Sequence, residues 1–150
     1  MYSLKCIKLG YIILYDDIIF IGGVCYPTAA TNMGTTSSGT YDSQVAPGLN
    51  KYLKSKGYGE VATYHSGTSN GKKLIPVINE NRPCILLLHG HYKYGDHGVL
   101  ALGYQQYVFE HWYGNDEDIY IRIMDGWTTR ANRFVWGGCS GNWNYVTVAL

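Results

Sequence analysis

The fold is decided by residues 84–124, CILLLHGHYKYGDHGVLALGYQQYVFEHWYGNDEDIYIRIM. This stretch contains short apolar or alternating runs, and its β-branched and aromatic residues favour the pleated surface of a sheet. The acidic segment Asn115–Asp118 between two of the runs predicts a solvated hairpin turn. Strands are therefore expected at residues 84–89, 97–104, 105–113 and 119–124, with a last one in the closing run NYVTVAL at residues 144–150.

The chain before residue 82 carries helical and loop signals instead. Residues 47–59, PGLNKYLKSKGYG, predict a helix that begins at Pro47, buries one apolar face and ends at Gly57. Further helices are expected at residues 27–33 and in residues 71–83, where Pro76 either makes the helix short or is confined to its first turn. Helices followed by antiparallel strands predict an α+β fold.

Composition and charge limit the possible functions. The 150 residues are 46% hydrophobic and 15% aromatic, which supports one globular domain over residues 1–150 and excludes general disorder. The formal net charge is +1 and the longest basic run is Lys72-Lys73, so nucleic-acid binding is not expected. The apolar segment at residues 9–23 is interrupted by Asp16 and Asp17, which makes it too short for a membrane span or a signal peptide.

The four cysteines are interpreted as free thiols, because they form no C-x-x-C pair and no dense disulfide pattern. Cys25 stands in GGVCYPTAATNM, residues 22–33, where Pro27 suits the first turn of a helix. A helix N-terminus stabilises a thiolate and lowers the thiol pKa from about 8.5. A nucleophile and a buried cysteine at a helix start both fit this motif. Small buried or loop positions are expected for Cys6, Cys84 and Cys139.

Two further motifs supply a base and a carboxylate. In GDHGVLALGY, His97 opens an apolar strand, where it can be held within hydrogen-bond reach of a thiol. In IYIRIMDGW, Asp125 ends a strand, where it can orient an imidazole while Trp127 shields that contact from water. Taken singly, such residues are more often parts of turns. In the order Cys, His, Asp they are the parts of a thiol-hydrolase triad.

On these motifs the chain resembles the papain-like cysteine peptidases, and more closely the bacteriocin-processing (double-glycine leader) peptidases and their free-standing bacterial relatives. GGVCYPTAATNM is similar to that family's Cys-x-Pro-Thr-Ala motif, and INENRPCILLLHGHYKYGDHGVLALGY to its Arg-Pro, strand and His-strand-Gly-Tyr block. IYIRIMDGW resembles its Asp-bearing strand end, so the resemblance spans about residues 20–130. It implies a papain-like α+β fold, with N-terminal helices packed on a C-terminal twisted antiparallel sheet.

The resemblance also implies an activity and a set of roles. It implies a cysteine peptidase in which Cys25 is the nucleophile, His97 the base and later the acid, and Asp125 the orienting carboxylate. A peptide or protein substrate is implied, with no cofactor or metal, and an extracellular or cell-envelope location is favoured. The substrate cleft is expected to include Gly23, Tyr26, Asp96 and Trp127.

One departure from the family concerns the oxyanion. The family's Gln shortly before the cysteine has no counterpart here, because residues 1–24 contain neither Gln nor Asn and Ile19 stands near the expected place. Losing one such donor costs about 10² to 10³ in turnover. The backbone N–H of Cys25 remains as a donor, and a slow peptidase, an unusual oxyanion partner and an inactive relative all fit this departure.

Two other functions stay open from the residues alone. One is a metal-dependent hydrolase, since His89, His91, Asp96 and His97 form H-x-H-x₄-D-H. The insertion spoils the zinc-site spacing, so His89 and His91 are expected in a loop beside a cleft. The other is a non-catalytic module that holds sugars or peptides on exposed aromatic rings. Its candidates are Trp112, Trp127, Trp136, Trp143, Tyr104, Tyr107 and Tyr113.

Overall fold

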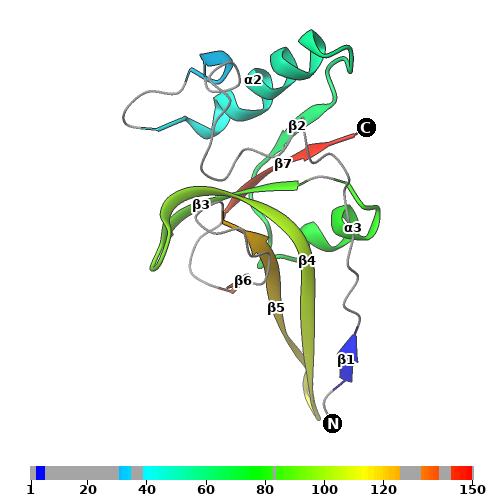
Figure 1. Ribbon diagram of the computed structural model, residues 1–150. Helices are drawn as coiled ribbons and strands as arrows, with labels where there is room; N and C mark the ends of the chain where they lie inside the picture. The colour runs from blue at the N-terminus through cyan, green and yellow to red at the C-terminus, as the bar shows by residue number, and fades with distance from the viewer. Residues whose placement is uncertain are drawn as a thin grey trace.

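The structure is a computed structural model that describes residues 3–5, 31–34, 39–82, 84–125, 133–138 and 143–149. Its elements are β1 (Ser3–Lys5), α2 (Asp42–Ser55), β2 (Ala62–His65), α3 (Leu74–Asn79), β3 (Cys84–His91), β4 (Gly95–His111), β5 (Gly114–Met124), β6 (Arg133–Trp136) and β7 (Asn144–Val148) (Figure 1). The strands form one antiparallel sheet in the order β2-β7-β3-β4-β5-β6, and β1 pairs with the far half of β4. The α+β class is confirmed.

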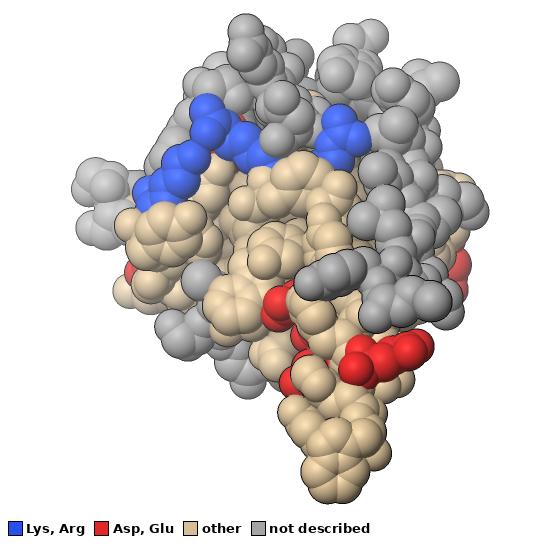
Figure 2. All heavy atoms as spheres, turned by 90° about the horizontal axis from the view of Figure 1, so that it is seen from below, with Lys and Arg blue, Asp and Glu red and all other residues tan. Residues whose placement is uncertain are grey.

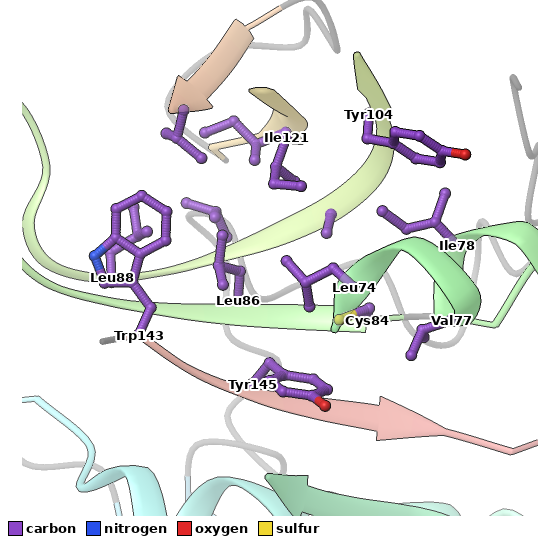
Figure 3. Close-up of a cluster of buried hydrophobic side chains, with 14 of the residues drawn as sticks. Leu74, Val77, Ile78, Cys84, Leu86, Leu88, Tyr104, Ile121, Trp143 and Tyr145 are labelled. Carbon is purple, nitrogen blue, oxygen red and sulfur yellow. The ribbon is translucent and has the colours of Figure 1, made fainter. Parts of the chain in front are cut away.

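Both faces of the sheet are covered at β3, where alternate side chains point to opposite sides. Cys84, Leu86 and Leu88 join the cluster under α3, together with Trp143 of the chain just before β7 (Figure 3). Ile85 and Leu87 join the cluster under α2. Burial on both faces explains why the sequence of β3 is continuously apolar rather than alternating.

Helix α2 begins earlier than predicted, at Asp42 instead of Pro47, and the proline lies inside the helix. Tertiary contacts hold the additional turn, since Val45 is buried in the cluster under α2. The Asp42 carboxylate accepts hydrogen bonds from His89 of β3 and from Asn144 at the start of β7. These contacts offset the one backbone donor that the proline removes. The predicted apolar face of this helix is buried.

Helix α3 lies inside the predicted range, with Pro76 in its first turn. Three strands were not predicted: β1, β2 and β6. They have three, four and four residues, too few for a clear alternating pattern. They are strands because they pair antiparallel with β4, β7 and β5, respectively. Of the expected helix at residues 27–33, Thr31 and Asn32 are helical, and residues 27–30 lie outside the described part of the chain.

The predicted turn at Asn115–Asp118 is wrong, because these residues belong to β5 and pair with β4. The chain reverses at Trp112 and Tyr113 instead, and the two predicted strands at residues 97–113 are largely the single strand β4. Gly114 follows with φ of 145°, a conformation that favours glycine. Acidic residues usually favour turns, but here the strand pairing decides the position of the reversal.

Side chains from other segments contact the acidic residues of β5. Nζ of Lys72 lies 2.8 Å from Oε2 of Glu117, and Nε1 of Trp136 donates a hydrogen bond to Asp118 at 3.0 Å. Residues 94–121 contain five acidic residues and no Lys or Arg. Figure 2 shows the molecule from below the view of Figure 1. On the face that is visible there, most Lys and Arg side chains lie toward one edge and most Asp and Glu side chains lie away from it.

Among the described residues, none of the helices has the length and apolar character that crossing a membrane requires.

Candidate active site

His97 and Asp125 meet at the end of two neighbouring strands. His97 lies in β4 opposite Leu88 of β3, and Asp125 directly follows β5. Antiparallel pairing of Leu100 with Met124 brings the two positions together, although they are 28 residues apart in the sequence. Nε2 of His97 lies 2.9 Å from the main-chain oxygen of Asp125. This hydrogen bond joins the imidazole to the main chain of the aspartate.

The hydrogen bond defines which nitrogen of His97 is basic. A carbonyl oxygen only accepts hydrogen bonds, so Nε2 must carry a proton. In the neutral ring Nδ1 then holds the lone pair. Nδ1 is therefore the atom of His97 that can take a proton from a nucleophile.

The Asp125 carboxylate is buried, with 1% of the residue exposed. The Tyr94 hydroxyl donates a hydrogen bond to its Oδ2 at 3.3 Å. Nε of Arg133 lies 3.0 Å from the same oxygen, an ion pair whose N–H is not aligned for a hydrogen bond. A buried carboxylate without a partner is strongly unfavourable, so these two side chains stabilise the charge and hold the group in place.

The expected loop position of His91 is wrong, because this residue ends β3 and is buried. Its Nδ1 accepts the backbone N–H groups of Lys93 at 3.1 Å and Tyr94 at 3.3 Å. Burial, and to a smaller extent the charge of Lys93, lowers the pKa of His91 and so favours the neutral acceptor form. The ring thus holds together the turn between β3 and β4.

The expected loop position of His89 is also wrong, since it lies within β3. Its Nε2 donates to Oδ2 of Asp42 at 2.7 Å, and its Nδ1 lies 3.8 Å from Oδ1 of Asp96. Asn144 donates to the same Asp42 oxygen at 2.7 Å, and Asp96 accepts the Gly90 N–H at 2.8 Å. This second His–Asp group connects α2 to the sheet. Within the described part of the chain, no group of three or more His, Cys, Asp or Glu side chains is arranged to hold a metal ion.

The described residues include one cysteine, Cys84, and its side chain is fully buried under α3 (Figure 3). Burial raises its pKa to about 12, against a smaller opposite effect of Arg82. A thiol in this position stays protonated and does not act as a nucleophile at neutral pH. The remaining predicted site residues, Cys25, Gly23, Tyr26 and Trp127, lie outside the described residues, as do Cys6 and Cys139.

Sequence reasoning missed three residues that bind the predicted ones: Tyr94, Arg133 and Asp42. No spacing pattern links them to His97 or Asp125. A chemical signal does exist for Arg133, because an aspartate that ends a buried strand needs a cation or several donors near it. It could not identify which arginine serves, since β6 pairs with β5 only in the folded sheet.

No family model, no curated protein and no solved structure matches this chain.

Proposed function

We propose that the protein is a cysteine peptidase with a papain-like fold, in which Cys25, His97 and Asp125 hydrolyse a peptide bond. The observation that carries the proposal is the hydrogen bond from Nε2 of His97 to the main-chain oxygen of Asp125, because it leaves Nδ1 as the basic nitrogen. The helix-start motif GGVCYPTAATNM supports the choice of Cys25 as the thiol. The burial and raised pKa of Cys84 remove one competing nucleophile.

In the proposed reaction, Nδ1 of His97 takes the proton of the Cys25 thiol, and the thiolate attacks the carbonyl carbon of the peptide bond. The backbone N–H of Cys25 donates to the resulting oxyanion. The C–N bond then breaks as the imidazolium gives its proton to the leaving amine, and a thioester remains. Water loses a proton to Nδ1 and attacks the thioester, the acid product leaves, and the thiol regains its proton.

The proposed substrate cleft is bordered by Gly23, Tyr26, Asp96 and Trp127. Of these, Asp96 is described, and its side chain is 80% exposed beside the turn between β3 and β4. It lies next to His97 in the chain, at the same end of the sheet.

Limiting iodoacetamide at neutral pH, followed by mass-spectrometric mapping, tests the nucleophile. Cys25 is expected to be labelled first, while Cys84 stays unmodified until the protein unfolds. Equal labelling of Cys25 and Cys84 in the folded protein would remove the basis for an activated thiolate.

A fluorescent casein assay then tests hydrolysis. Cys25→Ala and His97→Ala are expected to abolish cleavage, whereas the matched variant His89→Ala retains it, because that imidazole is paired with Asp42. A chelator should have no effect. Cleavage that survives Cys25→Ala but stops with a chelator would show that the activity is metal-dependent instead.

A peptide- or sugar-binding module without catalysis is the second candidate. It is favoured by the reversal between β4 and β5, where Trp112 is 96% exposed and Tyr113 67% exposed. Such rings hold sugars and peptides by stacking. This candidate predicts that Cys25→Ala leaves all measurable function intact and that Trp112→Ala removes it.

A further inference from the structure

Tyr94 contacts both described members of the proposed triad. Its hydroxyl donates to Oδ2 of Asp125 at 3.3 Å, and its ring lies beside the His97 imidazole with centroids 6.0 Å apart and planes inclined by 15°. The residue is 6% exposed, so surrounding atoms restrict its rotamer. A single rigid side chain thus connects the carboxylate of one residue with the ring face of the other.

The position of Tyr94 is itself determined by the turn between β3 and β4. Its backbone N–H and that of Lys93 both donate to Nδ1 of His91. The His91 ring also lies 5.1 Å from the Tyr94 ring, centroid to centroid. A chain of contacts therefore runs from His91 through Tyr94 and the Asp125 carboxylate to the main-chain oxygen that binds His97.

The charges at Asp125 strengthen this arrangement. Arg133 contacts the same carboxylate oxygen as Tyr94. Burial, followed by the charge and hydrogen bond of Asp125, raises the pKa of Tyr94, which keeps its hydroxyl protonated as a donor. With the carboxylate held from two sides, the backbone of Asp125 has little freedom to rotate its carbonyl away from His97.

From these contacts we infer that Tyr94, together with Arg133, is a positioning residue of the proposed peptidase site. It holds the Asp125 carboxylate so that the main-chain oxygen of Asp125 keeps the proton of His97 on Nε2. The catalytic consequence rests on the proposed function, whereas the effect on the tautomer of His97 does not.

Tyr94→Phe removes the hydroxyl and keeps the ring. The matched control is Tyr104→Phe, because Tyr104 lies in β4, the strand that follows the turn of Tyr94, is 9% exposed and donates to Oδ1 of Asn79 at 3.4 Å. The readout is the nitrogen NMR spectrum of the His97 imidazole in the folded protein above pH 8. One hydrogen bond contributes about 1 kcal/mol, which corresponds to about a fivefold change in an equilibrium.

The wild-type protein and the Tyr104→Phe variant should therefore show His97 mainly with the proton on Nε2. The Tyr94→Phe variant should raise the ratio of the Nδ1-protonated to the Nε2-protonated form about fivefold. An unchanged ratio in Tyr94→Phe, or an equal change in Tyr104→Phe, would overturn the positioning role.

Arg133→Gln and Arg133→Lys give a second test that does not depend on Tyr94→Phe folding. Arg133→Gln should shift the tautomer ratio in the same direction, and Arg133→Lys should restore at least half of the difference because it keeps a cation near Oδ2. If Arg133→Gln leaves the ratio unchanged, Arg133 has no positioning role.

Kinetics separate this inference from the proposed function. In an active peptidase, Tyr94→Phe should lower kcat by up to about threefold with little change in KM, because a smaller share of His97 then has a basic Nδ1 while the cleft is intact. A wild-type protein without thiol-dependent cleavage contradicts the proposed function but not the tautomer result. Full activity of Tyr94→Phe with an unchanged tautomer contradicts the positioning role alone.

Discussion

Gly48 of α2 lies so close to Met33 that a β-carbon on the glycine would be 2.5 Å from the Met33 Cα. Met33 is the last residue of GGVCYPTAATNM, and its side chain is buried in the cluster under α2. Met33, the last residue of the Cys25 motif, therefore packs directly against α2. Any larger residue at position 48 must push the two segments apart.

Gly48→Ala is accordingly expected to destabilise the protein by about 1–3 kcal/mol through overpacking. This is the reverse of the usual effect in a helix, where alanine is favoured over glycine by about 1 kcal/mol. Urea unfolding measures the difference. The control is Lys51→Ala, an exposed position of the same helix, which should change little. Equal or greater stability of Gly48→Ala would show that the contact with Met33 is not tight.

Asp125→Ala is expected to lower the free energy of unfolding by about 1–3 kcal/mol. The change leaves the Tyr94 hydroxyl without its acceptor and the Arg133 cation without its anion. The value lies at the low end for a buried pair because the Arg133 side chain is 38% exposed. The matched variant Glu80→Ala breaks the exposed Arg82–Glu80 pair and should cost less than about 0.5 kcal/mol. Equal losses from the two variants would contradict this account of Asp125.

Stability is expected to fall on acidification because of His65 and His91. Burial is the main cause that lowers the pKa of each ring, assisted by Arg82 and Lys73 at His65 and by Lys93 at His91. The unfolded chain therefore takes up these protons first as the pH falls. The stability that the neutral rings contribute is present above the unfolded pKa of about 6.5, and it is lost as the pH falls through the folded pKa values.

Urea midpoints at pH 8 and pH 5 measure this dependence. The midpoint should be lower at pH 5, and the double variant His65→Gln, His91→Asn should reduce the difference. A wild-type urea midpoint that is higher at pH 5 than at pH 8 would contradict the lowered pKa values.

Two tryptophans of the sheet region are expected to respond in opposite ways. Trp112 is 96% exposed, so Trp112→Ala should change the free energy of unfolding by less than about 0.5 kcal/mol. Trp143 is 1% exposed in the cluster under α3, so Trp143→Ala should cost about 3–5 kcal/mol. Thermal and urea unfolding of both variants tests the contrast. A large loss of unfolding free energy in Trp112→Ala would contradict the prediction and would indicate that this ring packs in a contact between molecules.

Local signals in the sequence predicted the elements that have strong patterns. The apolar run at Cys84 became β3, the proline of α3 fell in its first turn, and His97 and Asp125 were expected at a strand start and a strand end. That the two residues belong to neighbouring strands follows only from the pairing of β4 with β5. Local signals failed where a tertiary contact outweighed them. Asn115–Asp118 favours a turn by residue type, but pairing with β4 and contacts to Lys72 and Trp136 keep it in a strand.

By itself, the sequence determined the residue types available for chemistry and the alternation that makes β4 and β5 strands. Tertiary structure alone decided that the main-chain oxygen of Asp125 binds Nε2 of His97, and that Tyr94 and Arg133 hold its carboxylate. The physical reason is that the two-residue alternation of side chains along a strand is a local property of the chain. The partners of a buried charge, by contrast, come from segments that meet only when the sheet has formed.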